Sequence, residues 1–279
     1  MRQIPTKEII EAVKDSAIQA NYELGEDVLQ TLRDSLNNEE SPVGKEILAQ
    51  LIENAQIAMN ERIPICQDTG IAVIFAELGQ DVCVVGGDFR SALEEGIRQG
   101  YREGFLRKSM CHPFTRKNTG DNIPIIVHID VVPGNSLTIW VVPKGGGSEN
   151  MSRLFMLQPS EGWPGVRDRV VQTVVEAGPN PCPPTIVGVG IGGNFEQSAL
   201  LAKKSLLRPL GTSNPDHEQN QMEHELLGKI NKSGVGPQGL GGRVTSFAVH
   251  ILMMPCHIAS LPLAINIQCH ASRHVETVL

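Results

Sequence analysis

The spacing of apolar side chains predicts that the first sixty residues are helical. Apolar residues recur at every third or fourth position in three stretches, 9–17, 28–36 and 47–58, which is the spacing of one helix face. Ser41 and Pro42 are residue types typical of an N-cap and a first helical position. They predict that the third helix begins there.

Beyond residue 63 the pattern changes, and short apolar runs typical of strands alternate with runs of helical spacing. Strands are expected at 71–76, 82–85, 123–132, 137–142, 185–189, 244–253 and 261–267, and helices at 89–105, at 166–175, after Asn194 and at 217–230. This alternation predicts a mixed α/β fold. We expect one catalytic domain over 1–279, with a helical N-terminal layer over about 1–62 and an α/β body over about 63–279.

The composition narrows the possible functions. With 24 Lys and Arg against 31 Asp and Glu the net charge is −7, which argues against nucleic-acid binding. Aromatic residues make up only 4% of the chain, too few for a base-stacking surface or a carbohydrate groove. The first residues lack an apolar signal segment, and the longest apolar stretch, 250–263, is broken by Pro255 and Pro262. We therefore expect a cytoplasmic protein without a membrane span that acts on a small polar molecule.

Three of the six cysteines have polar, turn-like surroundings. Cys66 lies in ICQDTG, Cys182 in PNPCPP and Cys269 in QCHASR, whereas Cys83 lies in an apolar strand. A free cysteine is most often a small buried residue, but rigid polar loops are typical of metal ligands. The chain has no closely spaced cysteine pair, which argues against a zinc site. Three separate thiolates can instead bind a four-iron cluster, leaving one iron open as a Lewis acid.

Basic and glycine-rich segments suggest an anionic ligand. The segments 107–109, 116–122 and 144–150 combine Lys or Arg with backbone donors, a set suited to carboxylates, although solvated surface turns have the same composition. Three consecutive glycines, 145–147, would let backbone N–H groups approach an anion closely. Asp68 is the acid closest in sequence to Cys66, and His257 and His270 are expected near the third cysteine.

The segment 188–193 offers a competing interpretation. It fits G-x-G-x-x-G between an expected strand and an expected helix, as in a dinucleotide-binding site. The acidic residue at a suitable distance, Asp216, lies in a polar loop rather than at a strand end. We favour the interpretation that these glycines allow close packing between the strand and the helix.

Four segments together resemble a known family. The segments ICQDTG (65–70), NTGDNIP (118–124), KGGGSEN (144–150) and LPLAINIQCH (261–270) resemble those of the iron–sulfur hydro-lyases, which include class I fumarases and L-tartrate dehydratases. The likeness covers the chain from about residue 8 to 279. It implies a [4Fe-4S] cluster held by Cys66, Cys182 and Cys269.

The resemblance also implies the residues that face the substrate. They are Gln67, Asp68, Arg107, Gly146 or its neighbour Gly147, and His257, with Asp68 and His257 as the catalytic groups. The implied reaction is the reversible hydration of a small dicarboxylate, fumarate to (S)-malate, with the conversion of L-tartrate to oxaloacetate as the alternative.

The sequence ends soon after the third cysteine, whereas the long single-chain fumarases continue into a second domain. The resemblance therefore implies an alpha subunit, inactive alone, that needs a separate fumarase beta subunit in an αβ or α2β2 assembly. Two other classes stay open, a nucleotide-binding oxidoreductase and a non-catalytic iron–sulfur or scaffold subunit.

Overall fold

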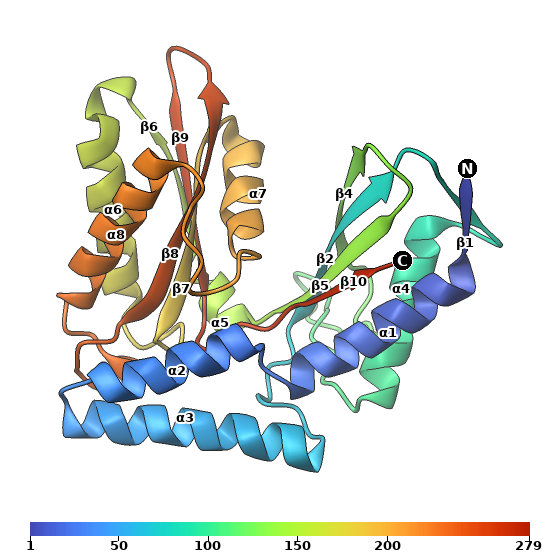
Figure 1. Ribbon diagram of the computed structural model, residues 1–279, viewed down its shortest axis with the longest axis horizontal. Helices are drawn as coiled ribbons and strands as arrows, with labels where there is room; N and C mark the ends of the chain where they lie inside the picture. Colours follow the sequence, from blue (N-terminus) through green and yellow to red (C-terminus); the bar gives the residue numbers. More distant parts are fainter. The chain divides into compact units, whose positions relative to one another are not determined.

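The computed structural model describes residues 1–279 and divides them into two compact units (Figure 1). Unit 1 comprises Met1–Gly25, Asn54–Gly146 and Arg273–Leu279, and unit 2 comprises Glu26–Glu53 and Gly147–Ser272. The mixed α/β class is confirmed, and three helices occupy residues 6–61 as predicted, but residues 2–5 form a strand that the apolar spacing did not indicate. None of the helices is both long enough and apolar enough to cross a bilayer.

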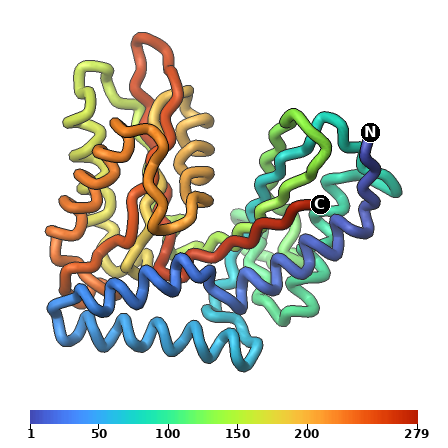
Figure 2. The backbone as a smooth tube through the Cα atoms, viewed as in Figure 1, coloured from blue at the N-terminus to red at the C-terminus, as the bar shows by residue number.

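Unit 1 is built on a four-stranded sheet in the order β10-β5-β2-β4, beside a two-stranded parallel ribbon of β1 and β3. Its elements are β1 (Arg2–Pro5), α1 (Thr6–Tyr22), β2 (Ile71–Gly79), β3 (Val82–Val85), α4 (Phe89–Glu103), β4 (Ile126–Val132), β5 (Leu137–Lys144) and β10 (Val275–Val278). Helix α1 packs against α4, β5 and β10. Strand β10 therefore lies beside α1, although the two are far apart in the sequence (Figure 2).

Unit 2 is built on a second four-stranded sheet, in the order β6-β9-β7-β8. Its elements are α2 (Glu26–Asn38), β6 (Arg153–Leu157), α6 (Gly162–Ala177), β7 (Thr185–Gly193), α7 (Phe195–Ser205), α8 (His217–Asn231), β8 (Ser246–Cys256), β9 (Leu261–Gln268) and two 3-10 turns at Pro159–Glu161 and Pro237–Gly239. Helix α7 covers one face of this sheet, and α6 and α8 cover the other (Figure 1). Helices α3 (Pro42–Glu61) and α5 (Gly146–Glu149) each include a boundary between the units.

Two predicted helix starts are confirmed in detail. The Ser41 hydroxyl accepts the Gly44 N–H at 3.2 Å at the start of α3. The Asn194 side chain accepts the Gln197 N–H at 2.9 Å at the start of α7. Each side chain satisfies one of the donors that a helix start leaves unpaired.

The glycines of β7 confirm the packing interpretation of the G-x-G-x-x-G segment. A Cβ atom at Gly188 would lie 2.1 Å from the Ala202 carbonyl oxygen, and one at Gly190 would lie 2.1 Å from that of Ser198. Both carbonyls belong to α7, so only glycine lets this helix lie so close to the strand.

His250 is a buried base within unit 2 and makes folding sensitive to acid. It is 2% exposed, and its Nδ1 lies 3.2 Å from the Ser205 carbonyl oxygen. Burial, assisted by the nearby Arg208 cation, lowers the pKa of His250 from 6.5 to about 4. Between these two pH values His250 is protonated in the unfolded chain but stays neutral in the folded chain. The contribution of His250 to the free energy of unfolding is therefore fully present above pH 6.5 and is lost as the pH falls towards 4.

We therefore expect a His250→Gln variant, which cannot titrate there, to lose less stability than the parent on acidification. Between pH 7.5 and 4.5 the difference in unfolding free energy should change in favour of the variant by about 2.5 kcal/mol. Urea unfolding at both pH values measures it. A difference that does not change with pH would contradict the assignment.

Candidate functional site

The first cysteine loop, residues 66–70, joins α3 to β2 within unit 1. The Asp68 N–H donates to Cys66 Sγ at 3.4 Å, and the Cys66 thiol lies 3.3 Å from the Gln67 side-chain oxygen. Both oxygens of the Asp68 carboxylate accept backbone N–H groups, from Gly70 at 3.0 Å and from Gly146 at 2.8 Å. The loop thus presents a thiol and a carboxylate in a fixed arrangement, and each carboxylate oxygen keeps a lone pair for a further donor.

Three buried side chains hold the backbone of this loop through the successive carbonyls of residues 68–70. Arg273 donates to the first, Tyr101 to the second at 2.7 Å and to the third at 3.1 Å, and Asn122 to the third at 3.3 Å. Burial raises the pKa of Tyr101 far above its usual value, so its hydroxyl stays a donor. The loop backbone is therefore fixed from the protein interior.

A hydrogen bond from Thr69 brings Arg107 beside the first cysteine loop. The Thr69 hydroxyl donates to the Arg107 carbonyl oxygen at 2.7 Å, while the Arg107 side chain is exposed. Asn122 accepts the N–H groups of Ser109 and Met110 at 2.7 and 3.0 Å. Asn122 of the NTGDNIP segment therefore anchors both the first cysteine loop and the non-helical segment that follows Arg107.

The glycine run contacts a different cysteine loop in each unit. In unit 1 the Gly146 N–H is used by Asp68, and a Cβ at Gly145 would lie 3.2 Å from the Asp68 carboxylate. In unit 2 a Cβ at Gly147 would lie 3.4 Å from the Asn180 carbonyl oxygen, two residues before the second cysteine. The run expected to bind a ligand carboxylate thus contacts a carboxylate of the protein itself.

Unit 2 brings the second and third cysteine loops together. Strands β7 and β9 are antiparallel, with Ile186 opposite Gln268, so the start of β7 and the end of β9 lie at the same end of the sheet. Cys182 precedes β7 and Cys269 follows β9 directly. The His270 N–H donates to the Cys182 carbonyl oxygen at 3.3 Å and ties the two loops.

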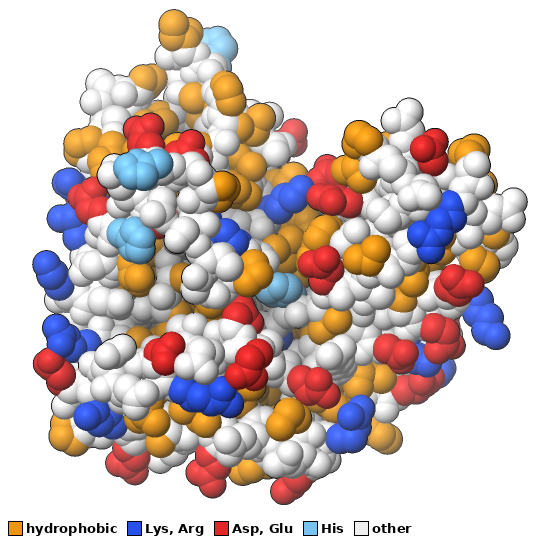
Figure 3. Space-filling model, viewed as in Figure 1, with side chains coloured by type: hydrophobic (Ala, Val, Ile, Leu, Met, Phe, Trp, Pro, Cys, Tyr) orange, Lys and Arg blue, Asp and Glu red, His pale blue; other side chains and the backbone are white.

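His257 lies at the opposite end of the strands of this sheet, so the expectation that it lies near Cys269 is wrong. It occupies the turn between β8 and β9, and the eight residues of β9 separate it from Cys269 by about 25 Å. Apolar side chains project around this turn, with Ile258 92% exposed (Figure 3). His257 also lines an apolar cavity of about 380 Å³ with Trp163 and Met222.

The cysteine loops have the chemistry of iron–sulfur ligands, although the structure gathers no group of three or more metal-binding side chains. No disulfide joins any of the six cysteines, and Cys182 is exposed in a backbone conformation with φ 56°. Cys66 belongs to unit 1, and Cys182 and Cys269 belong to unit 2. The N–H donated to Cys66 Sγ is the kind of hydrogen bond that tunes cluster thiolates.

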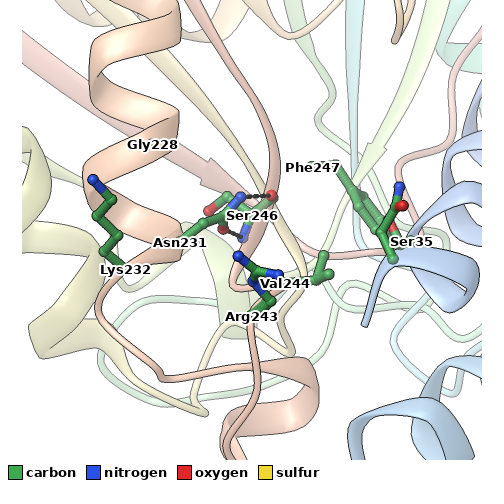
Figure 4. Close-up of a pocket in the computed structure, with 9 residues that line it drawn as sticks. Ser35, Gly228, Asn231, Lys232, Arg243, Val244, Ser246 and Phe247 are labelled. Atoms are coloured by element: carbon green, nitrogen blue, oxygen red, sulfur yellow. Dashed lines mark hydrogen bonds between the residues drawn. The ribbon is translucent and has the colours of Figure 1, made fainter. Parts of the chain in front are cut away.

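A larger cavity in unit 2, of about 500 Å³, contains none of the predicted site residues (Figure 4). It lies among α2, α8 and β8, and Lys232 and Arg243 line it. Arg243 is paired with Glu40, and Asn231 is bound to the backbone of Ser246. Arg243 and Asn231 therefore join neighbouring segments of the chain at this cavity.

Sequence reasoning missed the residues that hold the first cysteine loop. Tyr101 lies in the helix expected at 89–105, and Asn122 lies in the basic segment 116–122 and in the family segment 118–124, but neither pattern indicates a contact with the first cysteine loop. Arg273 stands four residues after Cys269, and this proximity to a candidate ligand was the one available signal.

Comparisons with known proteins find a family model and relatives that this chain resembles over nearly its whole length. The family model described as Fumarate hydratase (Fumerase) matches residues 10–278. A protein of Methanocaldococcus jannaschii named "Putative L(+)-tartrate dehydratase subunit alpha" is 40% identical over 273 residues, which cover 95% of this chain and 94% of that protein. The L(+)-tartrate dehydratase subunit alpha of Escherichia coli K12 is 31% identical over 277 residues, 98% of this chain and 91% of that protein.

Proposed function

Since the chain belongs to the fumarate hydratase family and is a hydro-lyase, we propose that it is the alpha subunit of a class I fumarate hydratase interconverting fumarate and (S)-malate. The observation that carries the proposal is the first cysteine loop, where a thiol and a hydrogen-bonded carboxylate lie beside an exposed arginine. A cytoplasmic location and a beta subunit, in an αβ or α2β2 assembly, belong to the same proposal. The "subunit alpha" names of the relatives support the partner.

Cys66, Cys182 and Cys269 would hold a [4Fe-4S] cluster. Within unit 2, the hydrogen bond from the His270 N–H to the Cys182 carbonyl oxygen ties the Cys182 loop to the Cys269 loop, which supports two of these three ligands. When bound, a cluster with three protein ligands supplies a Lewis acid for a hydroxyl group.

The residues around the first cysteine loop suit an elimination of water from a dicarboxylate. Removing a proton next to a carboxylate requires a cation to stabilise the charge that develops, and exposed Arg107 provides one. Asp68 would accept a substrate hydrogen through a free lone pair, because Gly70 and Gly146 already orient both of its oxygens. Gln67 and the Gly146–Gly147 segment would orient the substrate.

His257 would contact the substrate of a second molecule, because β9 separates it from Cys182 and Cys269 of its own chain. We expect His257→Ala and Cys182→Ser assemblies to be nearly inactive separately. Mixed and reassembled, they should regain part of the activity, up to about a quarter when one site in four receives both native residues. Turnover of the mixture measures this, and a mixture as inactive as its components would exclude the arrangement.

A second candidate substrate is L-tartrate, favoured by the names of both relatives. The test is anaerobic loading of the chain with iron and sulfide, addition of the beta subunit, and assay with malate, fumarate and L-tartrate. Malate–fumarate turnover with the spectrum of a four-iron cluster supports the proposal. Turnover of tartrate alone reverses the substrate assignment, and a cluster without turnover supports the non-catalytic alternative. Tight NAD binding without iron dependence would support the oxidoreductase.

A further inference from the structure

Arg273 is a buried cation without a counter-ion. It is 4% exposed, and its single hydrogen bond runs from Nη2 to the Asp68 carbonyl oxygen. Its Nε and Nη1 atoms are buried without a partner. An unpaired buried charge costs several kcal/mol, so a residue of this kind needs an explanation.

Holding the loop backbone does not explain the charge. The next two carbonyls of the loop are held by neutral donors, Tyr101 and Asn122, both of which are buried. A neutral side chain would hold the Asp68 carbonyl equally well and would avoid the cost of burying a guanidinium. The positive charge of Arg273 therefore serves an interaction other than its hydrogen bond to the Asp68 carbonyl.

The surroundings of Arg273 indicate an anion on the side of the first cysteine. Its charge and that of Asp68 both act on the Tyr101 hydroxyl, in opposite directions, so the three groups share one neighbourhood. Asp68 forms no ion pair with Arg273: its carboxylate oxygens accept the N–H groups of Gly70 and Gly146, and Arg273 donates only to the Asp68 carbonyl oxygen. The Asp68 carbonyl that Arg273 holds lies two residues after Cys66.

We propose that Arg273 is a positioning residue for the cluster, which fixes the first cysteine loop through the Asp68 carbonyl and compensates the negative charge of the thiolate-bound cluster. The inference rests on the proposed cluster at Cys66, Cys182 and Cys269. A guanidinium suits this role because it stays charged when buried and can bond a carbonyl through one nitrogen while two others remain free.

The test compares iron retention in the full-length chain with Arg273→Gln, Arg273→Lys and a matched control, Tyr101→Phe. The control removes buried hydrogen bonds to the same loop without changing any charge. Each chain is loaded anaerobically, desalted and challenged with a chelator, and iron and sulfide per chain are followed together with thermal unfolding of the metal-free protein. These readouts do not depend on turnover.

We expect Arg273→Gln to fold and to bind iron about 10- to 100-fold more weakly, the usual effect of removing a group that supports a metal ligand. Arg273→Lys, which keeps the charge, should retain more iron than Arg273→Gln. Tyr101→Phe should lose stability but keep iron better than Arg273→Gln does.

Iron retention in Arg273→Gln equal to that of the parent would overturn the inference and leave the proposed function intact. Equal losses in Arg273→Gln and Tyr101→Phe would also overturn it, because loop order alone would then explain retention. If Arg273→Gln does not fold, retention in Arg273→Lys above that of Tyr101→Phe supports the inference, and equal or lower retention refutes it. A parent chain that binds no iron refutes the proposed function itself.

Discussion

Replacing Cys182 by serine is expected to abolish the cluster and to reduce turnover by about 10³-fold or more, because a Lewis acid contributes several kcal/mol to such a barrier. Cys182 is exposed at the sheet edge and contributes nothing to the core, so the fold should survive the change. The same result is expected for Cys66→Ser and Cys269→Ser. Iron content, the visible spectrum and turnover with the beta subunit measure the effect.

The remaining cysteines provide matched controls. Cys256 is the exposed last residue of β8, and its thiol donates to the Ser260 carbonyl oxygen at 3.2 Å. A Cys256→Ser variant can keep that hydrogen bond and should retain iron and activity, as should Cys83→Ser on β3. Full iron content in any of the three ligand variants would show that the ligand set is wrong.

Replacing Gly190 by alanine is expected to have the largest effect on stability. The added Cβ would lie 2.1 Å from the Ser198 carbonyl oxygen, which cannot move without displacing helix α7 from the sheet. Overpacking of this kind costs about 3 kcal/mol or more, which lowers the melting temperature by about 10 °C in a chain of this size. Thermal unfolding followed by circular dichroism tests it, and Gly188→Ala should behave alike.

Gly228 on α8 is the matched control, because a Cβ there would meet nothing within 4 Å. Alanine at that helical position should stabilise the chain by about 0.5–1 kcal/mol. The comparison also distinguishes the two interpretations of the glycine-rich segment. A Gly190→Ala variant with unchanged stability would reopen the possibility that the segment binds a nucleotide.

The long periodic elements could be predicted from the sequence, whereas most of the short ones could not. Helix α4 and strand β2 lie where the apolar spacing indicated, because long amphipathic runs override local exceptions. Of the four-residue strands only β3, a continuous apolar run, was predicted. Strands β1, β6 and β10 were missed. They have only four or five residues, and their pairing with distant strands rather than their own composition makes them strands.

The cysteine loops were identified from their polar surroundings, but their support was not. Nothing in the spacing of Tyr101, Asn122 and Arg273 reveals that all three converge on one stretch of backbone, because that convergence depends on the pairing of strands distant in sequence. The position of His257 failed for a related reason. Closeness in sequence to Cys269 predicts closeness in space, but the extended strand β9 separates the two residues.

The inclusion of Arg273–Leu279 in unit 1 determines when that unit can be completed during protein synthesis. Strand β10 pairs with β5, and Arg273 holds the first cysteine loop, yet both are translated after all of unit 2. On the ribosome, α1, α4 and the inner strands therefore keep one sheet edge open until the whole of unit 2 has been translated. The first cysteine loop acquires its final support only when Arg273 leaves the ribosome, so iron acquisition would follow the translation of unit 2.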